Sequence, residues 1–202
     1  MRSPSEPVRS RREEYADATR DALLALARQV FTTEGYSQTG VEAISRGARV
    51  TRGAFYHHFA DKQALFDALV VSLQAEAAAK VRLAAQNEAD LADRVRVGAV
   101  AFLRICTDPT YRRLVIQDAP AVLGAARARA IGEAHPFGLL IGAVQALKSA
   151  GRFEVENAYL AGRMIGSMIC EAALLVGDAA APDEIERQAV AIVDRVLAAF
   201  IR

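Results

Sequence analysis

The sequence of 202 residues predicts an all-α fold. Along most of the chain, apolar residues recur every three or four positions, as on the buried face of a helix. Ala, Leu, Val and Arg dominate the composition, a mix that favours helices over sheets. No segment alternates apolar and polar residues as a strand does. We therefore expect about nine helices, divided between a small three-helix N-terminal domain and a larger helical C-terminal domain.

The composition is that of a soluble globular protein, with 52% hydrophobic and 24% charged residues. Lys and Arg number 25 and Asp and Glu 24, so a nucleic-acid-binding protein of this composition must concentrate its positive charge locally. The most apolar stretches are interrupted by Arg163, Glu171 and Asp178, and no secretory segment follows the N-terminus. We expect a cytoplasmic protein with no membrane span.

Residues that could carry catalysis or bind metal lack suitable partners. Cys106 and Cys170 lie far apart and form no CxxC pair, which disfavours both a metal site and a disulfide scaffold. Adjacent side chains on a helix point about 100° apart, so His57 and His58 do not make a metal pair. His135 has no Ser or Cys partner in the sequence. We expect no enzyme activity, no metal and no cofactor.

Two short helices joined by a tight turn follow a longer first helix within residues 15–60. The second helix runs from about Thr39, its expected cap, to Gly47, and the third begins at Thr51, also a natural cap. Phe55 and Phe59 anchor the third helix inward. This pattern predicts a helix-turn-helix unit, whose second short helix enters the major groove of DNA.

Small residues on the third helix allow close approach to base edges, and polar residues on its flanks supply phosphate donors. Arg52, Tyr56 and Lys62 are the expected phosphate contacts. The full set of candidate DNA-binding residues is Thr39, Arg49, Thr51, Arg52, Ala54, Tyr56, His57, His58 and Lys62. Residues 1–14, with a cluster of Arg9, Arg11 and Arg12, predict a flexible basic arm, which either is a plain disordered tail or touches DNA.

The run from Thr39 to Leu65, TGVEAISRGARVTRGAFYHHFADKQAL, resembles the DNA-binding signature of the TetR family of bacterial regulators. The resemblance covers roughly residues 15–70 and extends over both short helices and both flanks. It implies an all-helical C-terminal domain that forms a dimer.

Two positions depart from the family pattern. Arg49 stands in the turn where the family usually has Gly, and a left-handed conformation there costs a non-Gly residue about 1 kcal/mol. Either Gly47 shifts this strain or Arg49 accepts it and reaches a phosphate. Ser45 stands where the family often has Ala.

The C-terminal domain, residues 61–202, begins with a long helix capped by Asp61. Further helices are expected over 89–107, 109–120, 122–150 with a break at Pro136, 155–177 and 183–201. Small residues on the eighth helix and an apolar stripe on the ninth predict a dimer interface, with ordinary core packing as the alternative. The candidate interface residues are Gly162, Gly166, Ile192, Val193 and Val196.

A ligand cavity is expected between these last two helices and the DNA-binding unit. Its candidate lining is a bulky and adaptable set comprising Phe102, Cys106, Tyr111, Gln117, Phe137, Met164 and Met168, although each could equally be a core residue. Arg163, Ser167 and Glu171 share one helix face. They form a buried pair, contact a ligand or lie at the dimer seam, and the sequence does not choose among these.

These observations together predict a ligand-responsive DNA-binding transcriptional regulator. We expect a repressor that binds a palindromic operator in double-stranded DNA as a homodimer and is released by a small, mostly apolar effector. A helical small-molecule-binding protein without a DNA role and a helical-bundle enzyme are the alternatives.

Overall fold

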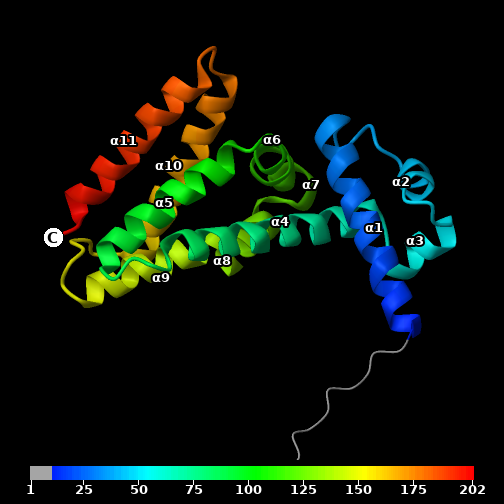
Figure 1. Cartoon of the computed structure of the whole chain (residues 1–202), viewed down its shortest axis with the longest axis horizontal. Helices are drawn as coiled ribbons and strands as arrows, with labels where there is room; N and C mark the ends of the chain where they lie inside the picture. Colours follow the sequence, from blue (N-terminus) through cyan, green and yellow to red (C-terminus); the bar gives the residue numbers. More distant parts are fainter. Residues whose placement is uncertain (1–10) are drawn as a thin grey trace, which may run out of the picture. The chain divides into compact units, whose positions relative to one another are not determined.

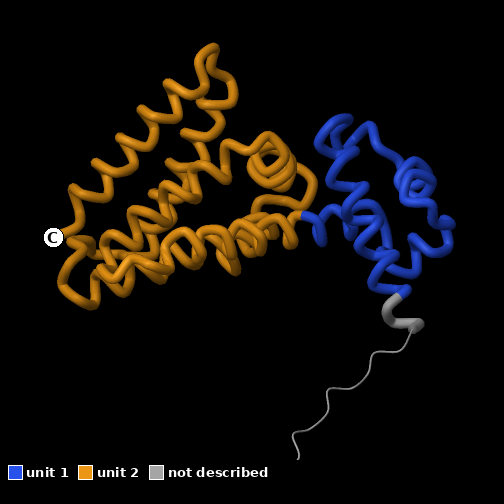
Figure 2. The backbone as a smooth tube through the Cα atoms, viewed as in Figure 1, with its two compact units in different colours: residues 1–69 blue, residues 70–202 orange. Residues whose placement is uncertain are grey.

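The computed structural model describes residues 11–202, with side chains from Tyr15 onward. The chain divides into two compact units, with the boundary between Leu69 and Val70 (Figure 2). Helix α4 (Lys62–Ala85) contributes residues to both units. Residues 1–10 of the expected basic arm lie outside the described residues. Helix α1 (Arg11–Thr33) begins within the last four residues of that arm.

The N-terminal unit contains the three predicted helices, α1, α2 (Val41–Gly47) and α3 (Arg52–His58), and the start of α4 (Figure 1). Its core is apolar and largely aromatic, because the buried faces of all four helices carry bulky side chains. The fully buried members are Leu23, Ala27, Phe31, Ile44, Phe55, Leu65 and Phe66. Gly35, with a φ of 91°, follows the end of α1 in the role expected of it.

The C-terminal unit is also helical but is divided into more segments than the sequence suggested. After α4 come α5 (Leu91–Thr107), α6 (Pro109–Tyr111), the π-helical segment η1 (Arg112–Asp118), α7 (Ala119–Leu123), α8 (Ala125–Ala134), α9 (Pro136–Ser149), α10 (Ala158–Asp178) and α11 (Pro182–Phe200). Gly124, with a φ of 83°, separates α7 from α8. At Pro136 the chain bends by 58° between α8 and α9, which confirms the expected break.

Helix α10 is the centre of this unit and packs against α5, α9 and α11. Ile165, Ile169 and Val176 of α10 are buried, as are Leu103 of α5 and Leu197 of α11. Among the described helices, α10 is long and apolar enough to cross a membrane, although its charged residues were expected to exclude this. This helix packs on three other helices of its own unit.

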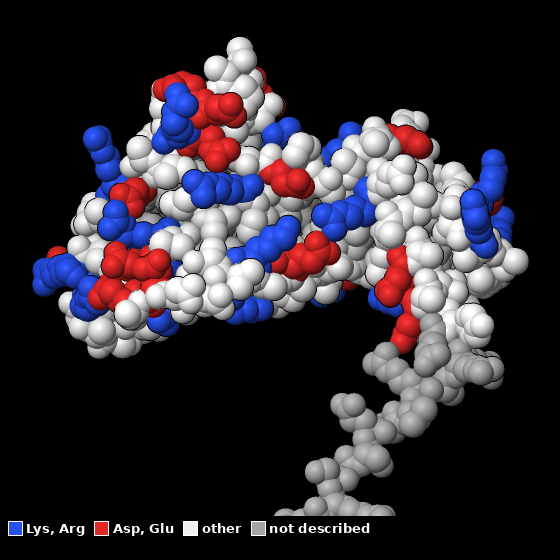
Figure 3. Space-filling view, viewed as in Figure 1, with Lys and Arg blue, Asp and Glu red and all other residues white. Residues whose placement is uncertain are grey.

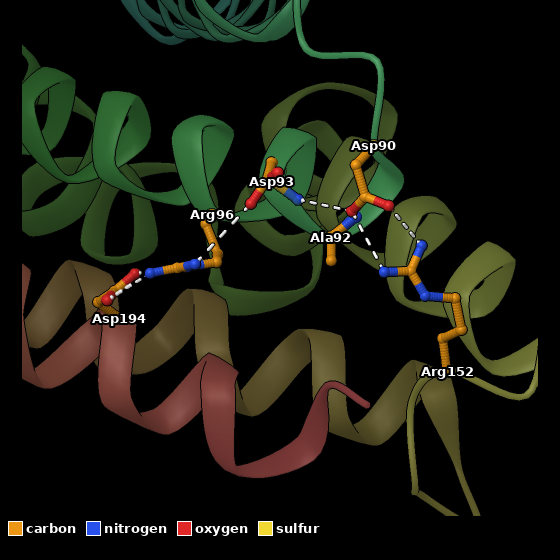
Figure 4. A network of polar contacts seen from close by, with 6 residues as sticks. All are labelled: Asp90, Ala92, Asp93, Arg96, Arg152 and Asp194. Atoms are coloured by element: carbon orange, nitrogen blue, oxygen red, sulfur yellow. Dashed lines mark hydrogen bonds and ion pairs between the residues drawn. The ribbon is translucent and has the colours of Figure 1, made fainter.

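Two arginine–aspartate pairs link neighbouring elements at the surface of the C-terminal unit (Figure 4). Arg96 of α5 donates from Nε and Nη2 to the two carboxylate oxygens of Asp194 in α11, both at 2.7 Å. Arg152, in the segment after α9, donates to Asp90, which also caps α5 by accepting from the backbone of Ala92 at 2.8 Å. Bidentate pairs of this kind fix the relative orientation of the elements they join.

Candidate functional site

The turn between α2 and α3 is tight because Arg49 adopts a left-handed conformation. Its φ is 57°, and it is the only non-glycine residue with a positive φ among residues 11–202. The turn is closed by a hydrogen bond from the Val50 backbone N–H to the Ser45 carbonyl, at 2.9 Å. Of the two alternatives, Arg49 therefore accepts the strain.

Gly47 has a different role from the one considered for it. It is the last residue of α2, and a Cβ there would come within 2.5 Å of the Leu26 side chain on α1. The absence of a side chain at Gly47 thus allows α2 to approach α1 closely. This contact lies within the N-terminal unit and helps to hold the helix-turn-helix pair on its support helix.

Helix α3 begins and is anchored as predicted. Thr51 is its N-cap, and the threonine Oγ1 accepts a hydrogen bond from the Ala54 backbone N–H at 3.0 Å. Phe55 is fully buried and Phe59 is 4% exposed. The opposite side of the helix presents Arg52, Gly53, Tyr56 and His57 to solvent, while Ala54 and His58 are half-buried. Basic side chains gather at this end of the N-terminal unit, around α2 and α3, on the face drawn in Figure 3.

The exposed Arg52 guanidinium is held in place before any DNA binds. It lies 2.8 Å from the Glu42 carboxylate of α2 and 5.6 Å from the centre of the Tyr56 ring. The hydrogen bond to Tyr56 and, to a lesser degree, the Glu42 charge raise the pKa of Arg52. Because both side chains of the ion pair are more than half exposed, a phosphate can replace Glu42 at small cost.

His58 differs from its neighbour His57 in its surroundings. Partial burial lowers the pKa of His58, and the positive charges of His57 and Arg20 lower it further. The neutral imidazole is therefore the favoured form of the half-buried His58 near pH 7. His57 is exposed and remains the better candidate for a contact with a base.

Thr39 was predicted wrongly both as a helix cap and as a DNA contact. Its side chain is only 2% exposed, and its hydroxyl donates to the Gly35 carbonyl at 2.9 Å. Gly40 is the N-cap of α2, with no side chain to accept a hydrogen bond. The polar group of Thr39 thus closes the loop after α1 and is not available to a ligand.

Lys62 also has a structural role that the sequence did not reveal. Its Nζ donates to the carbonyls of Tyr36 and Thr39, at 2.8 and 3.0 Å, and lies 4.1 Å from the centre of the Tyr36 ring. Lys62 therefore ties the α1–α2 loop to the start of α4. A phosphate contact would use the one ammonium proton that these two bonds leave over.

One cavity of the C-terminal unit, here called the α5–α9 cavity, has a volume of about 330 Å³. It lies between the last turns of α4, the first half of α5 and the first half of α9, and its walls are mainly apolar. The lining residues are Val81, Arg82, Ala85, Gln86, Arg94, Val95, Gly98, Ala99, Phe102, Pro136, Leu139, Leu140 and Ala143. Of the predicted ligand residues, this cavity includes Phe102.

Another cavity, here called the Tyr111 cavity, has a volume of about 310 Å³ and a more polar lining. Tyr111 and Phe137, both predicted, lie in its wall, and the Phe137 ring stands 5.8 Å from that of Phe102. The Tyr111 hydroxyl donates to Gln74 Oε1 at 2.8 Å. Gln74 was not predicted from the sequence, although it is a single amide in an apolar stretch of α4.

Arg163, Ser167 and Glu171 of α10, for which the sequence left several roles open, all line the Tyr111 cavity. Arg163 lies 3.7 Å from the Glu133 carboxylate and 4.6 Å from the centre of the Phe137 ring. Ser167 and Glu171 are exposed. The geometry favours the ligand-contact interpretation for this face.

Four predicted ligand residues line neither cavity. Gln117 and Met164 are exposed, Met164 by 64%, because the π-helical segment and α10 turn other residues inward. Met168 is half-buried outside both walls. Cys106 is fully buried, and this burial, with a hydrogen bond to Cys170, raises the pKa of its thiol well above the usual value. Cys106 is therefore a small core residue.

Both units match known protein families. Residues 23–69 match the family described as "Bacterial regulatory proteins, tetR family", and residues 92–200 match "Tetracyclin repressor-like, C-terminal domain". The chain belongs to the TetR family.

Curated relatives of this TetR-family protein match it over only part of its length. The regulator UidR of Escherichia coli (strain K12) is 34% identical over 67 residues, which are 33% of this chain and 34% of UidR. The repressor BepR of Brucella suis biovar 1 (strain 1330) is 44% identical over 55 residues, or 27% of this chain and 26% of BepR. The matched segment thus spans about a third or less of these relatives' length.

Solved structures resemble the TetR-family chain over most of its length. A TetR-family transcriptional regulator from Pectobacterium atrosepticum is 28% identical, with a TM-score of 0.74, over 96% of this chain and 98% of that one. RolR, solved in complex with resorcinol, is 18% identical, with a TM-score of 0.69, over 91% of this chain and 89% of that one. The second likeness shows a shared fold alone.

The small residues of α10 serve the core of this TetR-family chain, so their assignment to a dimer interface was wrong. A Cβ at Gly162 would lie 2.9 Å from Ile141, and one at Gly166 would lie 2.5 Å from the Phe137 ring, both on α9. Val193 is 1% exposed and belongs to the same core. These residues face neighbouring helices of their own chain.

A different face of α10 and α11 carries exposed apolar side chains. We call it the α10/α11 face and define it by Leu160, Met164, Leu175 and Ile192, each 53% to 64% exposed. Of the predicted interface residues, Ile192 lies on this face and Val196 is half-buried. A stripe of exposed large apolar residues on two packed helices is typical of a contact between proteins.

Proposed function

We propose that this protein is a ligand-responsive transcriptional repressor that binds a palindromic operator as a homodimer. The observation that carries the proposal is the exposed face of α3, held in position by the Arg49 turn and the Thr51 cap. The family match over residues 23–69 and the regulators that match about a third or less of the chain support it. We further propose that the protein acts in the cytoplasm, and that it regulates transcription without catalysing a reaction.

In this proposal, α3 enters the major groove and its two ends contact phosphates. Arg49, Arg52 and Tyr56 are the phosphate donors, because they are exposed and flank the helix. Ala54 and His57 face the base edges, where a small side chain and an exposed imidazole fit the groove. Lys62 supports the interface by holding the α1–α2 loop.

Dimerisation is proposed at the α10/α11 face. Two copies would form a four-helix arrangement in which the exposed stripes cover one another. Because each copy carries one α3, the dimer would recognise two half-sites about 34 Å apart.

The proposed coupling between ligand and DNA runs through α4. This helix starts beside Asp61 and Lys62 in the N-terminal unit and supplies Gln74 and Val81 to cavities of the C-terminal unit. A ligand that displaces α4 would change the separation of the two α3 helices in the dimer. Coupling of this kind ordinarily changes DNA affinity by about 5- to 150-fold, and DNA must change ligand affinity by the same factor.

Selection of DNA from a random duplex pool tests the DNA-binding part. We expect enrichment of a palindrome, measured afterwards by fluorescence anisotropy at several salt concentrations. Arg52→Ala should weaken binding to all sequences and reduce the salt slope by about one unit. Arg187→Ala, on the exposed side of α11, is the charge-matched control and should leave the slope unchanged. Failure to enrich any sequence would favour a helical small-molecule-binding protein without a DNA role.

Light scattering tests the dimer. The double variant Met164→Glu/Ile192→Glu should be monomeric at micromolar concentration and lose specific DNA binding, because it places charge in an apolar contact. Leu83→Glu is the control, since Leu83 is 64% exposed on α4, outside the α10/α11 face. A wild-type protein that is monomeric at this concentration would contradict the proposal.

A further inference from the structure

Two arginines stand at the α5–α9 cavity, and no acidic residue lines it. Arg82 comes from the last turn of α4 and Arg94 from the first turn of α5, and both side chains are exposed. The remaining wall is apolar apart from Gln86. The cavity thus has an apolar interior and a cationic edge.

The charges of these two arginines are not neutralised by the protein. Arg82 has no hydrogen bond or ion pair with any residue of the described part of the chain. Arg94 donates from Nε and Nη2 to the Glu88 carbonyl, at 3.2 and 2.7 Å, and this leaves the rest of its guanidinium available. By contrast, Arg96, two residues further along α5, is paired with Asp194 at 2.7 Å.

The Tyr111 cavity differs in its charged lining. Its Arg163 is ion-paired with Glu133, and its second arginine, Arg129, shares the wall with the Glu171 carboxylate. An anion would therefore meet a carboxylate in that wall but none in the wall of the α5–α9 cavity. The comparison therefore selects the α5–α9 cavity as the site for an anionic ligand.

We propose that the α5–α9 cavity binds an anionic amphiphile: a small organic acid whose apolar body fills the cavity and whose acidic group meets Arg82 and Arg94. The apolar body would lie against Val95, Leu139 and Leu140, with Phe102 in the same wall. A volume of about 330 Å³ is sufficient for a compact organic molecule. The role of this ligand as the effector rests on the proposed function. Its binding in the α5–α9 cavity does not depend on that function.

Two fluorescent probes with the same apolar body test the charge requirement. One is 1-anilinonaphthalene-8-sulfonate, and the other is N-phenyl-1-naphthylamine, which lacks the sulfonate. We expect the wild-type protein to bind the sulfonate more tightly. This preference should shrink between about 0.01 and 1 M salt, because screening at the exposed arginines increases.

Charge-removing variants assign the preference to the two arginines. Arg82→Gln and Arg94→Gln should each weaken sulfonate binding by about two- to fivefold, as expected for exposed ion pairs, and leave the neutral probe unchanged. Arg94→Lys keeps the charge and should retain most of the preference. Arg104→Gln, on the same helix but outside this cavity, controls for net charge. Ala143→Trp should exclude both probes by filling the cavity.

Equal binding of the two probes would overturn the proposal, as would an equal loss in Arg104→Gln. A sulfonate preference that survives in Ala143→Trp would also overturn it, because the probe would then be bound elsewhere. Titration with selected operator DNA separates this inference from the proposed function. If the arginine-dependent preference holds while DNA affinity is unaffected by the probe, the ligand site stands and the sensing role fails.

Discussion

The α2–α3 turn and helix α10 both depend on tight local packing, but they differ in how far that packing can be read from the sequence. In the turn, the constraint is local: Arg49, Thr51 and Phe55 lie within seven residues of one another. In α10, Gly162 and Gly166 leave room for Ile141 and Phe137, which belong to another helix, α9. A pattern of small residues shows that something approaches closely, but not which partner does so.

The largest expected effect tests the packing of α10. Gly166→Ala should lower the free energy of unfolding by about 1–3 kcal/mol, because its Cβ would meet the rigid Phe137 ring at 2.5 Å. Gly142→Ala on α9 is the matched control, since no atom lies within 4 Å of its Cβ. It should stabilise the helix by about 0.5–1 kcal/mol. Urea unfolding followed by circular dichroism measures both. A neutral Gly166→Ala would mean that this face does not pack on α9.

The next effect tests the backbone of the turn. Arg49→Gly should be more stable than Arg49→Ala by roughly 1 kcal/mol, because glycine adopts the left-handed conformation without strain. Both variants remove the guanidinium, so both should lose the same DNA affinity if Arg49 contacts a phosphate. Equal stability of the two variants would show that the turn is not strained at this residue.

An effect of similar size but opposite origin, the loss of a polar group, is expected at Ser45. Its Oγ is buried without a hydrogen-bond partner among the described residues, and the residue is 4% exposed. Ser45→Ala should raise the free energy of unfolding by about 1 kcal/mol, since it removes an unsatisfied polar group. Ser149→Ala, at the exposed end of α9, should change stability by less than about 0.5 kcal/mol. A destabilised Ser45→Ala variant would indicate a hydrogen bond at this hydroxyl.

The smallest effect concerns acid stability of the C-terminal unit. Hydrogen bonds from Arg152 and from the start of α5 lower the pKa of Asp90 from 3.8 to about 2. The folded state holds the proton less tightly than the unfolded state, so this contribution is present above pH 3.8 and is lost as the pH falls toward 2. Asp90→Asn should flatten the stability profile in that window and leave its shape near neutral pH unchanged. An unaltered acid profile would contradict the pairing.

The helix-turn-helix unit could be predicted to the residue because its signals are short-range. Thr51 caps α3, Asp61 caps α4 through Ala64 at 2.7 Å, and Gly35 follows α1, all as expected. The exceptions are Thr39, whose hydroxyl bonds the Gly35 carbonyl four residues earlier, and Lys62, whose partners only the folded loop brings near. Lys62, for example, bonds a carbonyl 26 residues away in the chain.

The cavity lining was predictable only in part. Phe102, Tyr111 and Phe137 were found because aromatic residues in apolar helices tend to surround a cavity. Arg82 and Arg94 resemble ordinary surface arginines in the sequence, and their shared position at one cavity depends on how α4 and α5 pack. The π-helical segment could not be foreseen, and it left Gln117 exposed.

The π-helical segment η1 is a place where the chain should tolerate the loss of one residue. In η1, hydrogen bonds skip one more residue than in an α-helix, so residues 112–118 hold one residue beyond what an α-helical register needs. Deletion of a single residue there should be absorbed by conversion to an α-helix, whereas the same deletion in α10 would rotate its buried face by about 100°. Conversion would change how this segment, which includes Val115 and Ile116, presents its side chains to the Tyr111 cavity. Homologous chains that differ by one residue at this point should therefore keep the fold and differ in the shape of that cavity.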